Sequence, residues 1–216
     1  MFLDDKKSDF FFSQLSQFKV EDKNGKNIGK PGDALFTKDF RIDSLILFGG
    51  LLEEKMEDLH LRENVDPIVP ISVIQTVDET NKKIVLNVAK DELKSTNNSF
   101  VAPEGLMQFI KLKKLPIFEK NNEKIGRVVD IFFEKDGKFK LIVGGGALEE
   151  FLEKVRVIPD KDLIVPGSSL VGDITDKITI KLDKMQLLST LEEVKDDPNQ
   201  LLTTDKVSFI PRGMNR

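Results

Sequence analysis

A long segment of this chain occurs twice, and the repeat limits the fold more than any other feature of the sequence. The two copies, LILFGGLLEEKMEDLHLRENVDPIVP (45–70) and LIVGGGALEEFLEKVRVIPDKDLIVP (141–166), align at an offset of 96 without a gap. Twelve of the 26 aligned positions are identical, where chance gives roughly one or two. A chain that repeats itself in this way is expected to fold into two similar units.

The repeat continues on both sides of this segment. Upstream, 23–36 matches 120–133 at an offset of 97, and downstream, 83–93 matches 177–187 at an offset of 94. Residues 94–105 are rich in Ser, Asn, Pro and Gly, which is typical of a linker. We therefore predict a first domain over 1–95 with its core at 15–95, a linker over 96–111, a second domain over 112–190 and a C-terminal tail over 191–216.

Each copy has the pattern of short strands joined by tight turns. Asn24-Gly25 and Asp136-Gly137 favour hairpin turns, because these residue types tolerate positive φ. Apolar residues alternate with a period of two in 138–146, and 147–155 has the apolar spacing of a two-turn helix. Five or six short antiparallel strands and one small helix per copy are expected to curl into a small barrel, which removes exposed strand edges.

The second copy resembles a known domain family. Its characteristic segment is Lys124-Ile125-Gly126-Arg127-Val128-Val129-Asp130, followed by the Asp136-Gly137 turn and the Val165-Pro166 strand. These motifs resemble the PRC-barrel domain, named for the photosynthetic reaction-centre H subunit and also found at the C-terminus of bacterial ribosome-maturation factors.

The first copy carries a weaker version of the same motifs. It has Asn27-Ile28-Gly29-Lys30 and Val69-Pro70, but Pro31-Gly32 interrupts its strand and suggests a bulge or a kink. The Gly-Gly and Leu-Glu-Glu step in both copies is similar to archaeal members of the family. The resemblance implies a mainly β chain with two tandem small PRC-like antiparallel β-barrels, each with a short helix.

The composition leaves few residues for catalysis. The chain has no Cys and a single His, His60, so it lacks thiol nucleophiles, zinc–thiolate sites and most triad chemistry. We predict no catalytic, cofactor-binding or metal-binding residue, and therefore no enzyme. No apolar stretch approaches about 18 residues and the N-terminus lacks a long apolar core, so we expect no transmembrane segment, no secretory signal and a cytoplasmic protein.

Three features could carry chemistry, and each has a plainer structural explanation. Gly144–Gly146 precedes a helix without a phosphate-binding glycine pattern, so we expect a bulge there. Asp33 and Asp130 lie at matching positions inside strands, where they are expected to cap a turn or line a barrel mouth. Acids recur early in the helix of both copies, where they favour the helix dipole; they are Glu53, Glu54, Glu57, Glu149, Glu150 and Glu153.

Two apolar segments and one basic cluster are candidates for contact with a partner. Each apolar segment either packs on its own barrel or is offered to a partner by strand addition. The residues are Phe10, Phe11, Phe12, Val207, Phe209 and Ile210. The basic candidates for contact with an anion or RNA are Lys111, Lys113, Lys114 and Arg127. Residues 111–216 carry 19 Lys+Arg against 18 Asp+Glu, and 1–110 carry 14 against 19, so the second half suits an anionic surface better.

Two similar units without residues for chemistry give two comparable docking surfaces, which raise effective concentration when both engage. We therefore predict a non-enzymatic adaptor or scaffold that binds other proteins and needs no cofactor. The resemblance to archaeal PRC-barrel proteins implies a role in cell division. A homodimer and an internal pseudo-dimer both stay open. The alternative is a ribosome-assembly or RNA-associated factor that uses the basic side of the second unit, although a net charge of −4 speaks against RNA.

Overall fold

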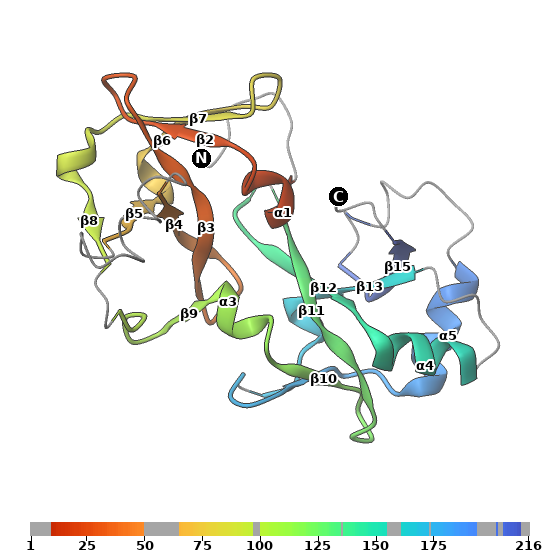
Figure 1. Ribbon diagram of the computed structural model, residues 1–216. Coiled ribbons are helices and arrows are strands. Elements are labelled where there is room, and N and C mark those ends of the chain that lie inside the picture. The colour runs from red at the N-terminus through yellow and green to blue at the C-terminus, as the bar shows by residue number, and fades with distance from the viewer. Residues whose placement is uncertain are drawn as a thin grey trace. The chain divides into compact units, whose positions relative to one another are not determined.

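The computed structural model describes residues 10–49, 65–96, 100–134, 136–154, 161–172, 174–193, 202 and 205–212 (Figure 1). Contacts divide the chain into two compact units. Unit 1 lies within Met1–Phe10, Gln14–Ile110 and Lys135–Lys138, and unit 2 within Phe11–Ser13, Lys111–Glu134 and Phe139–Arg216.

Unit 1 is built on a mixed sheet with the strand order β6-β7-β2-β3-β4-β5-β8, and β9 lies beside β3. Short 3-10 turns at Ile71–Val73 and Lys90–Glu92 connect its later strands. The strands are β2 (Lys19–Glu21), β3 (Asn27–Thr37), β4 (Ile42–Phe48), β5 (Pro67–Pro70), β6 (Ile74–Asp78), β7 (Lys83–Leu86), β8 (Lys94–Ser95) and β9 (Leu106–Gln108).

Unit 2 is built on a mixed sheet with the order β14-β10-β11-β12-β13-β15, and β1 lies beside β11. Its strands are β1 (Phe10–Phe11), β10 (Pro116–Phe118), β11 (Lys124–Phe133), β12 (Phe139–Gly144), β13 (Lys161–Pro166), β14 (Ile178–Thr179) and β15 (Ser208–Pro211). A 3-10 turn spans Gly167–Ser169. The α-helices in the described residues are α1 (Phe12–Leu15), α3 (Phe109–Leu112), α4 (Gly146–Lys154) and α5 (Lys184–Glu193).

The strand order is the same in the two units. The series β7-β2-β3-β4-β5-β8 in unit 1 corresponds strand for strand to β14-β10-β11-β12-β13-β15 in unit 2. The counterpart of β6 in unit 2 is the single antiparallel bridge between Leu170 and Ile180. The sequence repeat therefore becomes a repeat of topology, with loops of different length.

The expectation of a mainly β chain is confirmed, but the expectation of purely antiparallel strands is wrong at one pair in each unit. β2 runs parallel to β7, and β10 runs parallel to β14. β7 and β14 come late in each copy. Each pairs with the first strand of its copy, β2 or β10, on the side away from β3 or β11. Neither sheet closes on itself in the part of the chain that the structure describes, so closed barrels stay a prediction.

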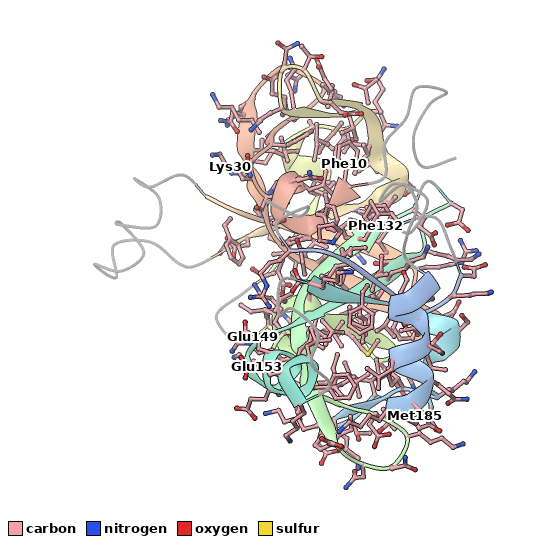
Figure 2. All side chains as sticks on the ribbon, turned by 90° about the vertical axis from the view of Figure 1, so that its right-hand side faces the viewer. Phe10, Lys30, Phe132, Glu149, Glu153 and Met185 are labelled. Atoms are coloured by element: carbon pink, nitrogen blue, oxygen red, sulfur yellow. The ribbon has the colours of Figure 1, made fainter. Side chains whose placement is uncertain are left out.

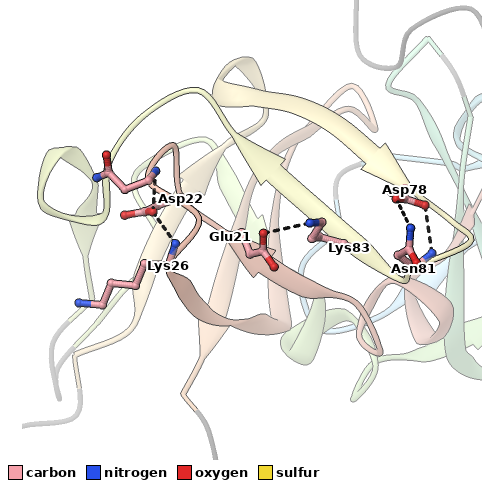
Figure 3. Close-up of polar contacts among 7 residues, drawn as sticks. Glu21, Asp22, Lys26, Asp78, Asn81 and Lys83 are labelled. Carbon is pink, nitrogen blue, oxygen red and sulfur yellow. Dashed lines mark hydrogen bonds and ion pairs between the residues drawn. The ribbon is translucent and has the colours of Figure 1, made fainter.

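The turns follow the sequence pattern. Gly25 (φ 76°) and Gly137 (φ 84°) adopt the positive φ that glycine tolerates. At the first of these turns, the Asp22 carboxylate accepts hydrogen bonds from the backbone N–H groups of Asn24 and Lys26, both at 2.9 Å (Figure 3). The same figure shows Lys83 of β7 paired with Glu21 of β2 at 3.1 Å, across the parallel strand pair.

A β-bulge lies at the same place in both units. The register of β3 against β4 shifts between Pro31 and Asp33, and that of β11 against β12 shifts between Val128 and Asp130. The bulge expected from Pro31-Gly32 is therefore confirmed. It does not depend on proline, because the second unit forms it with two valines.

The glycine of the first bulge has a packing reason. A Cβ at Gly32 would lie 2.2 Å from the ring of Phe48, whereas in unit 2 the side chain of Val129 comes within 3.3 Å of a Cβ at Gly144. Gly32 corresponds to Val129 and Phe48 to Gly144 in the repeat. In unit 1 the space is filled by Phe48 of β4, and in unit 2 by Val129 of β11. The large Phe48 therefore explains why the first copy has glycine where the second has Val129.

The predicted short helix is present in the second copy as α4, which buries Leu148, Phe151 and Leu152 against its unit. Its counterpart in the first copy falls within 50–64, outside the described residues, as do Glu53, Glu54, Glu57 and His60. Residues 208–211, assigned above to a C-terminal tail, form β15 and pair with β13.

Candidate functional site

The bulge in each unit is followed at once by a buried carboxylate. Asp33 and Asp130 are each only 2% exposed, although they lie on long strands whose alternation would send every second side chain outward. A bulge adds one residue to a strand and so re-aims the side chains around it. The shared bulge thus sets both carboxylates into the interior of their units.

Asp33 is held by backbone and side-chain donors in unit 1. Its Oδ1 accepts the N–H of Ala34 at 2.9 Å and the N–H of Ile110 at 3.0 Å. The amide of Gln108 donates to Oδ2 at 3.4 Å. Burial raises the pKa of Asp33 above its ordinary value, and these hydrogen bonds offset part of the increase.

Asp130 has the corresponding arrangement in unit 2. Its Oδ1 accepts the N–H of Ile131 at 2.9 Å and the N–H of Ser13 at 3.3 Å. The Ser13 hydroxyl donates to Oδ2 at 2.5 Å. Burial raises the pKa of Asp130 too, against the hydrogen bonds of Ser13 and Ile131 and the positive charge of Lys113.

Both carboxylates bind a segment that we call an arm. Arm 1 is 10–15 and arm 2 is 106–112; each consists of a short strand, β1 or β9, and one turn of helix, α1 or α3. Each helix turn ends with the same backbone hydrogen bond, from Phe18 to Leu15 at 2.9 Å and from Leu115 to Leu112 at 3.0 Å. The two arms are therefore one local structure used twice.

Each arm precedes one repeat in the chain but pairs with the sheet of the other repeat. Arm 1 leads into the first repeat, yet β1 pairs with β11 of the second repeat. Arm 2 leads into the second repeat, yet β9 pairs with β3 of the first, with Leu35 opposite Gln108 and Thr37 opposite Leu106. Each sheet is thus extended by the segment that precedes the other repeat.

The phenylalanines of arm 1 are buried. The ring of Phe11 lies 5.1 Å from that of Phe132, and the ring of Phe12 lies 6.3 Å from that of Phe133, all within unit 2. Phe10 packs edge-on against Phe18 in unit 1, with 5.7 Å between the ring centroids. Of the two alternatives left open by the sequence, packing is the one observed, but Phe11 and Phe12 pack on the second repeat.

The C-terminal apolar segment is buried as well. Val207, Phe209 and Ile210 belong to or adjoin β15, and Ile210 shares a core cluster with Phe11 and Phe132. A role in partner binding for this segment and for Phe10–Phe12 stays a prediction.

A buried lysine ties this C-terminal segment to the sheet. Lys140 of β12 is 1% exposed and pairs with Glu134 at 2.9 Å. Its ammonium also donates to the backbone carbonyl of Leu202 at 2.6 Å. A charge this deeply buried must be paired, which Glu134 provides. The hydrogen bond to Leu202 then fixes where the chain passes before β15.

The predicted basic cluster lies at the surface. Lys111, Lys113 and Lys114 are exposed at the end of α3 and just after it, and Arg127 is exposed on β11 opposite Pro116 of β10. Their contact with an anion or RNA stays a prediction.

The bulge expected at the glycine-rich step is not observed, because the register of β12 against β11 shifts between Val128 and Asp130 and not at Gly144. Gly145, with φ 101°, joins the end of β12 to the start of α4, and a Cβ at Gly144 would lie 2.7 Å from Asp162 Oδ1. Of the acids on α4, Glu149 is bound to Arg212 at 2.7 Å, while Glu153 is exposed (Figure 2). Within the described residues, no group of three His, Asp or Glu side chains is placed to hold a metal ion. No helix in the same residues is long and apolar enough to span a bilayer.

Sequence reasoning missed the arms, although a signal for them exists. At the offset of 97 that relates 23–36 to 120–133, Phe12 matches Phe109 and Leu15 matches Leu112. The repeat therefore begins earlier than position 15. The sequence does not show that each arm pairs with the other repeat, because the similarity of the two arms does not reveal which unit each one joins.

The second half of the chain matches a known protein family. No curated protein matches the chain. The matching region begins just before arm 2 and ends inside α5, so it covers most strands of unit 2 but neither arm 1 nor β15. It is this region, residues 104–187, that matches the family model of the PRC-barrel domain.

Proposed function

We propose that this protein is a non-enzymatic adaptor or scaffold whose two units each act as a PRC-type protein-interaction module. The observation that carries the proposal is the PRC-barrel match over 104–187, because domains of this kind often mediate protein interactions. The shared strand order supports extending the same role to unit 1.

The chemistry of the chain supports a binding role over catalysis. The most unusual carboxylates, Asp33 and Asp130, are occupied by backbone and hydroxyl donors of the arms and face the interior. A general acid or base must reach a substrate proton, and neither group is exposed to do so. By the archaeal resemblance, we further propose that the protein works in the cytoplasm and in cell division.

The test is a crosslinking pull-down from the native cell with the full chain as bait. Exposed lysines in both units, such as Lys26 and Lys154, provide attachment points for lysine-reactive crosslinkers. The adaptor function predicts a recurrent set of proteins crosslinked to both units and retained after nuclease treatment. Recovery of no enriched protein contradicts it.

A charge-reversal variant separates this function from RNA binding. The variant Lys111→Glu, Lys113→Glu and Lys114→Glu changes only exposed side chains, so it should recover the same proteins as wild type. If capture instead falls steeply with salt, disappears with nuclease and is abolished by the three substitutions, the protein is an RNA-associated factor.

A further inference from the structure

The two arms and their carboxylates form two copies of one assembly site. In each, an N–H of the arm helix donates to Oδ1 of the aspartate: Ile110 to Asp33 and Ser13 to Asp130. Both donors and both acceptors are related by the repeat offset of 97. The two hydrogen bonds agree in chain position, in acceptor atom and in the helix turn that donates. Such agreement is not expected of an accidental contact.

Each unit is incomplete without the arm it receives. Phe11 of arm 1 belongs to a core cluster of unit 2 whose other members all come from the second half of the chain, namely Phe132, Ile142, Ile164, Leu202 and Ile210. Removing arm 1 would empty that position and take two donors from the buried carboxylate of Asp130. A buried carboxylate without donors costs several kcal/mol, so an empty site is strongly disfavoured.

The same reasoning applies to unit 1. Phe109 of arm 2 belongs to unit 1 and is only 3% exposed. Without arm 2, Asp33 would lose the donors of Ile110 and Gln108, and β3 would lose its pairing with β9. Unit 1 thus depends on a segment that the sequence assigns to the second repeat.

We propose that each arm site is an assembly interface for the other repeat, so that this single chain reproduces an arm-exchanged dimer. The arms hold the two repeats together, and the linker at 96–105 only keeps them on one chain. The partner that fits each site is a PRC-type unit that carries a Phe-x-x-Leu arm, here supplied by the same chain. This goes beyond the proposed adaptor function and does not depend on any external partner.

The experiment cuts the full-length folded protein in the linker. Residues 97–99 are replaced by the recognition sequence of a specific protease, and the purified chain is cleaved without denaturant. The expected result is that both fragments elute together as one species of the intact mass, 24.4 kDa, and stay together on dilution. Separation of the fragments on cutting overturns the proposal.

Arm variants show whether the arms hold the fragments. Phe11→Ala with Ser13→Ala weakens one site, and Phe109→Ala weakens the other. Each is expected to raise the dissociation constant of the cut fragments at least about 10-fold, since loss of a buried Phe costs more than the 1.4 kcal/mol that tenfold represents. The comparison variant is Phe48→Ala, which truncates an exposed Phe outside both arms. If the arm variants weaken association no more than Phe48→Ala does, other contacts hold the fragments and the proposal is wrong.

Hydrogen exchange provides a test that needs no variant. The amides of Ser13 and Ile110 donate to buried carboxylates and are expected to be protected to the same degree before and after cutting. Loss of that protection on cutting overturns the proposal even if the arm variants do not fold.

Discussion

Asp33 and Asp130 lie 97 positions apart and hold the same hydrogen bond, each accepting through Oδ1 the backbone N–H of an arm helix. Each also binds the N–H of its own next residue, Ala34 or Ile131, at 2.9 Å. Two carboxylates in separate units therefore do one job: they anchor the segment that precedes the other repeat.

The first prediction concerns the energy of this anchor. Asp130→Ala leaves the Ser13 and Ile131 donors without their acceptor, so we expect a loss of about 2 kcal/mol or more in the free energy of unfolding. Asp39→Ala, at an exposed turn position, is the matched control and should change stability by less than about 0.5 kcal/mol. Urea denaturation measures both. Equal effects of the two substitutions would show that the anchor contributes nothing.

The second prediction concerns pH. Burial raises the folded-state pKa of both Asp33 and Asp130 above the ordinary value of 3.8. Between the ordinary and the raised pKa the folded protein binds more protons, so these groups favour folding at low pH and that stability is lost as pH rises through the folded pKa. The double variant Asp33→Asn and Asp130→Asn cannot titrate there.

We therefore expect wild type to gain stability relative to the double variant as the pH falls from about 7 to about 4. Chemical denaturation at several pH values in that window measures the difference. A difference that stays constant, or that shrinks on acidification, contradicts the raised pKa values.

The third prediction concerns the buried ion pair in unit 2. Glu134→Gln removes the carboxylate that pairs with the buried Lys140 ammonium, and we expect a loss of about 3 kcal/mol. Lys140→Met removes the buried charge itself and leaves Glu134, whose side chain is 22% exposed and can be hydrated. Lys140→Met should therefore destabilise less than Glu134→Gln in thermal or urea unfolding. The reverse order would mean that Lys140 acts mainly through its bond to Leu202.

The fourth prediction concerns the exchange of a large and a small residue between the units. Gly32→Val introduces a side chain where the Phe48 ring already lies, and we expect a loss of about 1–3 kcal/mol from overpacking. In the background of Phe48→Ala the same substitution should cost far less, because the ring is gone. A double-mutant cycle measures the coupling. Additive effects of the two substitutions would show that the ring is not what excludes a side chain at position 32.

The sequence predicted the parts of the fold that depend on local pattern. The hairpin turns at Gly25 and Gly137, the bulge at Gly32 and the helix α4 follow from residue type and spacing, which short segments carry within themselves. The parallel pairing of β2 with β7 was missed, because it joins Val20 to Ile84 across 64 positions and no local pattern encodes a partner that distant.

The candidate site shows the same division. Asp33 and Asp130 were identified as matching strand residues, because the repeat makes them visible. Their arm partners were not, since Ser13 is 117 positions from Asp130 and Ile110 is 77 from Asp33. The apolar character of Phe10–Phe12 indicated burial or binding, but only three-dimensional packing shows which core each ring enters.

β8 pairs with β5 in unit 1 and β15 pairs with β13 in unit 2, but the connections that lead to β8 and β15 differ greatly in length. In unit 1 the 3-10 turn at Lys90–Glu92 leads almost directly into β8, whereas in unit 2 the ten-residue helix α5 and a further stretch of chain precede β15. A strand therefore reaches the same position in both sheets although the connection before it differs in length. In unit 2 the longer connection adds α5, which exposes Met185, where the described part of unit 1 has only the short 3-10 turn before β8.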